Sequence, residues 1–306
     1  MDKNQALTLP RVAVVIPTFN RWPYVREAVN SVLAQTYTNV ECVVVDDAST
    51  DRTSVFLSSE YRDRIRLLTK TKNGEKSAAR NDGIKATQAA FVCVLDSDDL
   101  LTPESVEVRL RVFLDDRDFD GVAYGPVVGE EDWGEPPRRS GNSPEGDVLE
   151  AYVKDHFVRN PGYLISTANM LRYGMYREDL THREDVELLV RLAARLEFRC
   201  CHAPVARIRR VDRSARFDYG KYLQQGDRLV AYLRSDPYVL TRLGDRLADI
   251  EFSEAKGLAR AQYRTSDYRG FRRSYLDLCR SWPGRMLAEG RFLRRFLFSL
   301  LRPGGA

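Results

Sequence analysis

The chain has 306 residues, of which 43% are hydrophobic and 30% are charged, so it has enough apolar side chains to form a core. Its net charge of +4 is too small to indicate nucleic-acid binding by itself, and we expect no nucleic-acid partner. No run of residues reaches the roughly 18 apolar residues that a membrane-spanning helix needs, and no apolar signal segment opens the sequence.

Short apolar runs alternate with segments of helical spacing over the first hundred residues. The apolar runs predict strands and the segments between them predict helices. The predicted strands are 11–16, 40–45, 64–68 and 90–95, and the predicted helices are 22–35, 51–60 and 75–89. Because strands and helices alternate, the pattern favours a mainly parallel sheet with helices on both faces.

The rest of the chain continues the α/β pattern after a long predicted loop and then becomes entirely helical. The next predicted elements are a long loop over 125–147, a strand over 163–171 and a helix over 184–196. After Arg216 the spacing is helical to the end, with breaks expected at Pro237 and Pro283. We therefore predict an α/β domain over residues 1–215 and a helical carboxyl-terminal region over residues 216–306.

The cysteines indicate the cellular compartment. There are five, an odd number, and none forms a Cys-x-x-Cys pair. Cys42 and Cys93 lie in apolar runs and are expected to be buried thiols. This usage predicts a reducing, cytoplasmic location.

Polar residues follow three of the predicted strands. Pro17 and Thr18 follow the first, Asp46 and Asp47 the second, and the run 96–99 the fourth. The carboxyl ends of parallel strands meet at one edge of a sheet, where ligands of such folds bind. We therefore expect these residues to form one site.

The run Asp96-Ser97-Asp98-Asp99 places three carboxylates within four residues. Carboxylates this close repel one another unless they are solvated, capped or bound to a cation, and Mg²⁺ or Mn²⁺ can bridge one or two of them to substrate phosphates. The alternative is an acidic turn in which Asp99 caps the following helix.

Two other polar segments lie near these strand ends. Asp47 is placed to accept the imide N–H of a uracil or thymine base; alternatively, Ser49 or Thr50 simply caps the next helix. Arg80 is a candidate contact for the nucleotide, either at its base or at its diphosphate, because a guanidinium pairs well with phosphate oxygens. The alternative is that Arg80 belongs to a solvated helix face.

Two charged segments occur later in the chain. Glu184 and Asp185 begin the predicted helix over 184–196. They either interact favourably with the helix dipole or supply a general base that deprotonates an acceptor hydroxyl. A basic run follows, either to neutralise a leaving diphosphate or as a solvated loop. It consists of Arg207, Arg209, Arg210 and Arg213.

Taken in order, five segments resemble the motifs of the family-2 glycosyltransferases, which have the GT-A fold. They are VVIPTFNR (14–21), VVVDDASTD (43–51), KSAARNDGI (76–84), FVCVLDSDD (91–99) and REDVELLVRLA (183–193), in the family's order and spacing. The resemblance implies an inverting, metal-dependent hexosyltransferase that uses a nucleotide sugar, with Mg²⁺ or Mn²⁺ as cofactor, in the synthesis of polysaccharide, glycolipid or glycoconjugate.

The resemblance also implies a role for each matched residue. Thr18 and Asp47 resemble the residues that hold the base, Asp96 the ribose or metal contact, and Asp98 the main carboxylate ligand of the metal. Asp185 resembles the catalytic base, with Glu184 beside it on the acceptor side, and we expect the Asp185 carboxylate to point into the strand-end cleft. The implied nucleotide-binding residues are Pro17, Thr18, Asn20, Asp47, Arg80, Asp96 and Arg209, and the implied metal ligands are Asp98 and Asp96.

One position departs from the family pattern. Many relatives complete the metal shell with the histidine of a segment like Arg-Ile-His, where this chain has Arg207-Ile208-Arg209. Arginine cannot ligate a cation, although it can pair with a phosphate. The departure implies a metal that is held more loosely, an outcome that we favour over metal independence.

The carboxyl-terminal tail falls outside the resemblance. Residues 285–302 combine Phe and Leu with arginines, which suits a membrane interface at the inner face of the membrane. The alternative is an amphipathic helix that packs on the α/β domain or on a second subunit in a homodimer. Gly290 and the clustered apolar run 296–301 disturb a two-faced pattern, which favours packing.

The sequence leaves the substrates open. We expect a UDP- or dTDP-linked donor, and a glycan, a lipid-linked compound or a small molecule as acceptor. A nucleotidyltransferase would need a glycine-rich basic loop after the first strand, where this chain has PTFNRW. A non-catalytic nucleotide-sugar binding protein is the other alternative, and the Glu184-Asp185 pair argues against it.

Overall fold

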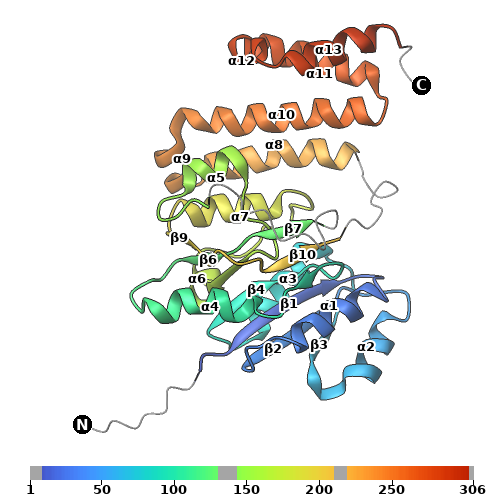
Figure 1. Cartoon of the computed structure of the whole chain (residues 1–306). Coiled ribbons are helices and arrows are strands. Elements are labelled where there is room, and N and C mark those ends of the chain that lie inside the picture. Colours follow the sequence, from blue (N-terminus) through green and yellow to red (C-terminus); the bar gives the residue numbers. More distant parts are fainter. Residues whose placement is uncertain (1–8, 130–142, 210–218, 303–306) are drawn as a thin grey trace. The chain divides into compact units, whose positions relative to one another are not determined.

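A computed structural model describes residues 9–129, 143–209 and 219–302. The chain divides into two compact units, Met1–Arg216 and Phe217–Ala306. The first is an α/β unit and the second is helical (Figure 1). Residues 130–142 of the expected long loop, and Arg210 and Arg213 of the basic run, lie outside the described residues.

The α/β unit is built on a seven-stranded sheet in the order β3-β2-β1-β4-β8-β6-β9. The strands are β1 (Val12–Thr18), β2 (Val40–Asp46), β3 (Arg66–Thr69), β4 (Phe91–Val94), β6 (Val122–Tyr124), β8 (Tyr163–Ser166) and β9 (Phe198–Cys200). The four amino-terminal strands are parallel, whereas β8 runs antiparallel to both of its neighbours. The predicted α/β fold with a mainly parallel sheet is therefore confirmed.

Helices cover both faces of this sheet (Figure 1). On one face, α1 (Tyr24–Leu33) packs its apolar side against a core that includes Val14 and Ile16 of β1. On the other face, α3 (Glu75–Ala86) lies so close that a Cβ at Gly83 would meet Val15 Cγ1 at 2.4 Å. Glycine at position 83 therefore brings α3 directly onto β1 and β2, and this close contact fixes the polar residues of α3 near the strand ends.

The remaining elements of this unit flank the sheet. The helices are α2 (Thr53–Tyr61), a short 3-10 helix η1 (Arg62–Arg64), α4 (Ser105–Asp115), α5 (Leu149–Asp155), α6 (Thr167–Arg172) and α7 (Glu184–Ala193). A second, three-stranded sheet has the order β5 (Leu100–Leu101), β10 (Ala206–Ile208), β7 (Val127–Gly129). Two expectations were wrong here. The predicted strand over 163–171 ends at Ser166, because the Ser166 hydroxyl accepts the Asn169 N–H at 3.2 Å and caps α6. Residues 127–129 of the predicted loop form β7.

The carboxyl-terminal unit contains only helices among its described residues. They are α8 (Tyr219–Ser235), α9 (Pro237–Leu243), a short 3-10 helix η4 (Gly244–Arg246), α10 (Leu247–Arg264), α11 (Tyr268–Ser281), α12 (Pro283–Leu287) and α13 (Gly290–Leu300). Pro237 and Pro283 each occupy the first turn of a helix, which confirms the predicted breaks. In the described part of the chain, no helix combines the length and the apolar character needed to cross a bilayer.

Candidate active site

A cavity of about 290 Å³ opens at the carboxyl ends of β1, β2 and β4. It brings together five of the residues that the sequence predicted for the site, Pro17, Thr18, Asp47, Asp96 and Asp98. Because β1 pairs in parallel with both β2 and β4, the polar residues after the three strands lie at the same edge. The predicted residues Asn20, Arg80, Arg209, Glu184 and Asp185 do not line this cavity.

Thr18 and Asp47 form one side of the cavity. Among the described residues, the buried Thr18 hydroxyl has no hydrogen-bond partner, so it can still donate to or accept from a ligand. The Asp47 carboxylate accepts the Gly74 N–H at 3.0 and 3.1 Å and lies 2.9 Å from Lys70 Nζ. Asp47 therefore also holds the turn that leads into α3.

Asn20 joins the loop after β1 to the loop after β2. Its side-chain oxygen accepts the backbone N–H groups of Thr50 at 2.8 Å and Asp51 at 3.1 Å, and its backbone N–H donates to Ser49 Oγ at 2.9 Å. The expectation that Ser49 or Thr50 caps α2 was wrong, because Asp51 Oδ1 accepts the N–H of Thr53 at the start of that helix. Asn20 therefore holds the two loops of the site together and does not itself line the cavity.

The acidic run forms the other side of the cavity. Asp96 Oδ1 lies 2.5 Å from Arg80 Nη2, and Asp98 Oδ2 lies 3.7 Å from Arg21 Nη2. The expectation that Asp99 caps the next helix was wrong, because its carboxylate accepts the backbone N–H of Arg209 at 3.1 Å, and α4 begins only at Ser105. Asp99 therefore binds the backbone just after β10, whereas Asp96 and Asp98 line the cavity.

Arg80 connects the cavity to α7. Its side chain is only 1% exposed, so the expectation of a solvated helix face was wrong. One guanidinium nitrogen contacts Asp96, and another contacts Glu184 Oε1 at 2.7 Å. Lys76 Nζ, on the same helix, lies 2.6 Å from the same glutamate oxygen. Two cations of α3 thus hold the first residue of α7.

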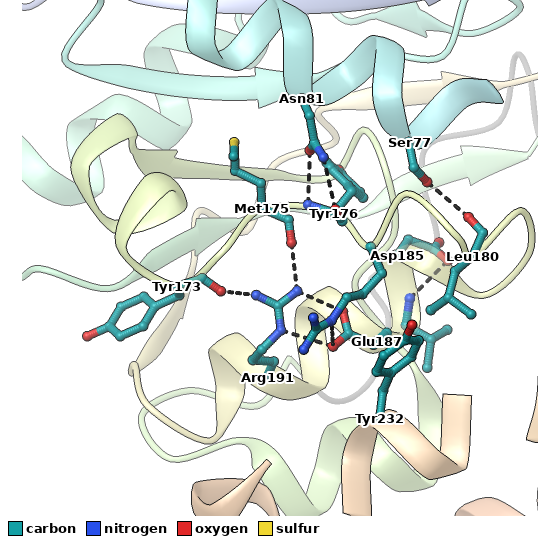
Figure 2. A network of polar contacts seen from close by, with 12 residues as sticks. Ser77, Asn81, Tyr173, Met175, Tyr176, Leu180, Asp185, Glu187, Arg191 and Tyr232 are labelled. Atoms are coloured by element: carbon teal, nitrogen blue, oxygen red, sulfur yellow. Dashed lines mark hydrogen bonds and ion pairs between the residues drawn. The ribbon is translucent and has the colours of Figure 1, made fainter. Parts of the chain in front are cut away.

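Further hydrogen bonds join α3 to the chain before α7 (Figure 2). Asn81 donates to the carbonyl oxygen of Tyr176 and accepts its backbone N–H, and Ser77 donates to the carbonyl oxygen of Leu180. Within α7, Arg191 bonds to the Glu187 carboxylate and to backbone carbonyls of residues 173 and 175. These bonds fix the segment that presents Glu184 and Asp185.

The two acidic residues that begin α7 have opposite electrostatic environments. Burial pushes the pKa of Glu184 upward, but Lys76 and Arg80 outweigh burial and hold the pKa below its ordinary value. The pKa of the neighbouring Asp185 is raised, first by burial and then by the negative charge of Glu184. Glu184 is therefore a fixed anion within an ion-pair network, whereas Asp185 holds a proton more readily than an ordinary aspartate.

Asp185 does not line the cavity, contrary to the expectation that its carboxylate points into the strand-end cleft. Its Oδ1 accepts the Val186 N–H at 2.9 Å at the start of α7. The preceding Arg183 adopts a left-handed conformation with φ of 64°, which sets the direction in which the chain enters α7. Asp185 is connected to the cavity through Glu184, whose partner Lys76 lines it.

Arg209 lies away from the cavity wall. Its guanidinium is 2.6 Å from Glu27 Oε2 and lies over the Tyr24 ring at 5.7 Å from the ring centre. The cations that do line the cavity are Arg21 and Lys76, and neither was assigned a role from the sequence. Both lie within segments that resemble family motifs, so their position in those motifs was the available signal.

The donor atoms at the cavity partly suit a divalent cation. Carboxylate oxygens such as those of Asp96 and Asp98 are the ligands that Mg²⁺ and Mn²⁺ prefer. In the described part of the chain, no three His, Cys, Asp or Glu side chains lie together as a metal-binding group. A cation at this cavity would thus fit only if phosphate oxygens and water supplied its other ligands, which is usual for Mg²⁺.

Comparisons with known proteins agree with this geometry. Residues 13–180 match the family model described as Glycosyl transferase family 2. An uncharacterized glycosyltransferase of Rickettsia felis is 29% identical over 77% of this chain and 39% of its own length. The chondroitin synthase of Pasteurella multocida is 34% identical over 36% of this chain and 11% of its own length. The chain therefore spans less than half the length of these curated relatives.

Solved structures show the same fold. The crystal structure of residues 1–349 of TarS from S. aureus covers 94% of this chain and 88% of its own, with a TM-score of 0.64 and 18% identity. The same protein in complex with UDP-GlcNAc gives a TM-score of 0.63 with 20% identity and covers 94% of this chain and 89% of its own. At this identity the likeness establishes the GT-A fold.

Proposed function

Because the chain belongs to glycosyl transferase family 2, we propose that it transfers a sugar from a UDP- or dTDP-linked donor to a hydroxyl acceptor with inversion at the sugar carbon. The observation that carries the proposal is the cavity at the strand ends, where Thr18 and Asp47 face the carboxylates of Asp96 and Asp98. We place the reaction in the synthesis of polysaccharide, glycolipid or glycoconjugate, with a glycan, lipid-linked or small-molecule acceptor.

The nucleotide binds at the side formed by β1 and β2. The unpartnered Thr18 hydroxyl and the Asp47 carboxylate supply a donor and acceptors for the edge of a pyrimidine base. UDP and UDP-GlcNAc complexes of the similarly folded TarS support a UDP-linked donor. Asp96, which is held by Arg80, is placed to contact the ribose.

The diphosphate binds over the acidic run and the cavity cations. Asp98, with Asp96, would hold Mg²⁺ or Mn²⁺, which supplies positive charge to the leaving diphosphate when it is bound. Arg21 and Lys76 line the same cavity and add fixed positive charge for phosphate oxygens. Since Arg209 pairs with Glu27, we assign the direct phosphate contacts to Arg21 and Lys76 and give Arg209 a supporting role beside the acidic run.

Asp185 acts as the general base in this proposal. A hydroxyl acceptor becomes a good nucleophile as its proton leaves, and a carboxylate near the reacting oxygen can accept that proton. The raised pKa of Asp185 suits a group that gains a proton during the reaction, whereas the paired Glu184 is held as an anion by two cations. A non-catalytic binder would bind the nucleotide equally well and would transfer no sugar.

The nucleotide assignment predicts a preference among diphosphates. UDP or dTDP should bind more tightly than ADP, and Asp47→Ala should weaken UDP binding by about 1–3 kcal/mol, because a charged hydrogen bond is lost. Isothermal titration calorimetry measures both effects. Asp82→Ala is the matched control, since Asp82 also pairs with Lys70, at 3.3 Å, but does not line the cavity. Equal affinity for ADP and UDP in the wild-type protein would contradict base recognition by this site.

The metal assignment predicts that nucleotide binding loses its dependence on the cation when Asp98 is replaced. Asp98→Ala should abolish the enhancement of UDP binding by Mn²⁺, because it removes the carboxylate that we assign as the main ligand of the cation. A thermal-shift titration with and without Mn²⁺ measures this. Full transfer activity in excess chelator would overturn the metal assignment and leave Arg21 and Lys76 as the charges that act on the diphosphate.

A further inference from the structure

The last helix of the chain has two distinct faces. On one face, Phe292 is buried against α11, Phe296 stacks on Tyr275 with ring centres 4.3 Å apart, and Ser299 is buried. Arg272 of α11 donates to the Ser299 carbonyl oxygen at 2.6 Å. These contacts fix the rotation of α13. The expectation that Gly290 and the apolar run 296–301 disturb a two-faced pattern was wrong, because Gly290 begins the helix and the run divides between its two faces.

The other face is a stripe of exposed leucines. Leu293, Leu297, Leu300 and Leu301 are 49%, 54%, 56% and 82% exposed, respectively. Their spacing of four, seven and eight residues from Leu293 places all four on one side of a helix. Exposed leucines are ordinary when they are scattered, but a contiguous stripe of four indicates a surface that contacts something apolar.

The charges around this leucine stripe all have one sign. Arg291, Arg294, Arg295 and Arg302 lie on or directly after α13, and residues 290–302 contain no Asp or Glu. In the part of the chain that the structure describes, Arg291 and Arg294 are exposed and have no acidic partner. Arginines along an apolar stripe complement a surface that is apolar inside and negatively charged at its boundary.

We propose that α13 binds the surface of an anionic lipid bilayer, with the leucine stripe in the acyl boundary and the arginines at the lipid phosphates. A helix of this kind lies in the plane of the interface and does not span the membrane. A second copy of the chain is a poorer partner, because pairing two such helices would bring arginine-rich segments together without an acidic residue in either one.

The test uses the full chain and vesicles of phosphatidylcholine with or without phosphatidylglycerol. The protein should sediment with the anionic vesicles and much less with the neutral ones. The triple variant Leu293→Gln, Leu297→Gln, Leu300→Gln should lower the partition coefficient by about tenfold or more, because it removes the apolar contact. Arg291→Gln and Arg294→Gln should each lower it by about fivefold, and 1 M salt should weaken wild-type binding because charges are then screened beyond about 3 Å.

A second triple variant controls for the general effect of removing exposed apolar side chains. Val55→Gln, Leu114→Gln, Leu171→Gln changes residues of similar exposure in the α/β unit and should leave vesicle binding unchanged. Circular dichroism checks that both triple variants keep their helix content. Equal sedimentation of the wild type and the α13 triple variant would overturn the proposal. A wild-type dimer in light scattering that the α13 triple variant converts to a monomer, without vesicle binding, would instead identify the stripe as a self-association surface.

Discussion

Asp185→Asn should cut turnover by roughly 10²–10⁴-fold, the usual contribution of a general base, while the affinity for the nucleotide sugar changes little. The substitution keeps the size of the side chain and its oxygen, which accepts the Val186 N–H, so α7 can still begin in the same way. Donor affinity should persist because Asp185 does not line the cavity that we assign to the nucleotide. Turnover with a competent acceptor and the dissociation constant of the donor are the two measurements.

The pH dependence of the wild-type enzyme tests the same assignment. Burial and the charge of Glu184 raise the pKa of Asp185, so the carboxylate is lost to protonation at a higher pH than the ordinary aspartate value of 3.8. Activity should therefore fall as the pH is lowered through a value above 3.8, and Asp185→Asn should remove that acid limb from its residual activity.

Glu178→Gln is a suitable control for the loss of one negative charge. Glu178 is exposed and accepts the Asn81 amide N–H at 2.9 Å through an oxygen that glutamine retains. This variant should keep both turnover and the pH profile. If Asp185→Asn stays within a few-fold of the wild type, the base lies elsewhere and the role of α7 in the proposed reaction is wrong.

Arg80→Met should lower the free energy of unfolding by about 3–5 kcal/mol at neutral pH, the usual cost of removing one partner of a buried ion pair. The side chain of Glu184 is 3% exposed, and among the described residues Lys76 is the one cation left to compensate its charge without Arg80. The same substitution should weaken donor binding, because Asp96 loses its 2.5 Å ion pair with Arg80 at the cavity. Urea unfolding and calorimetry with UDP measure the two effects.

The effect of Arg80→Met on stability should depend on pH. In the wild type the pKa of Glu184 lies below 4.5, so its ion pairs stabilise the folded state above that pH and are lost as the pH falls through the lowered value. Without Arg80, Lys76 alone opposes the effect of burial, so Glu184 takes up a proton at a higher pH than in the wild type. The variant therefore loses less folding stability than the wild type when the pH is lowered. The difference in stability between wild type and variant should therefore be largest at neutral pH and should narrow toward pH 4.5.

Arg109→Met provides a matched control for burying a methionine in place of arginine. Arg109 is equally buried, but the acceptors that bind its guanidinium are neutral, namely the carbonyl oxygens of Ser105, Pro161 and Tyr163, the Ser105 hydroxyl and the Cys93 sulfur. Its stability loss should show no comparable pH dependence. An Arg80→Met loss that is equally flat between pH 7.5 and 4.5 would mean that the Arg80–Glu184 pair contributes little.

The sequence predicts the sheet well because its strands are continuous apolar runs with polar residues at their ends. Those ends meet at one edge, so the grouping of Thr18, Asp47 and Asp98 also follows from the order of the segments. The burial of Arg80 does not follow in this way, because its partner Glu184 lies 104 residues away and only the fold brings the two together. On a polar helix, an arginine without a known partner is expected to face solvent.

Individual side-chain contacts explain the other differences between the predicted and the observed structure. Nothing in the composition of residues 163–171 distinguishes strand from helix, and the Ser166 cap decides where one ends and the other begins. Arg209 was expected at the phosphates from its place in the family pattern, but Glu27 of α1 takes its guanidinium at 2.6 Å. That partner is 182 residues away along the chain, so sequence spacing could not indicate it.

The bonds of Asn20 have a kinetic consequence for the proposed donor. They tie the loops after β1 and β2 together through contacts of the chain itself, so the base meets a surface that does not depend on the nucleotide for its order. Little chain entropy then has to be lost during the encounter. Association should proceed in a single step whose rate rises in proportion to nucleotide concentration, and differences in affinity among pyrimidine nucleotides should arise mainly in how fast each one leaves.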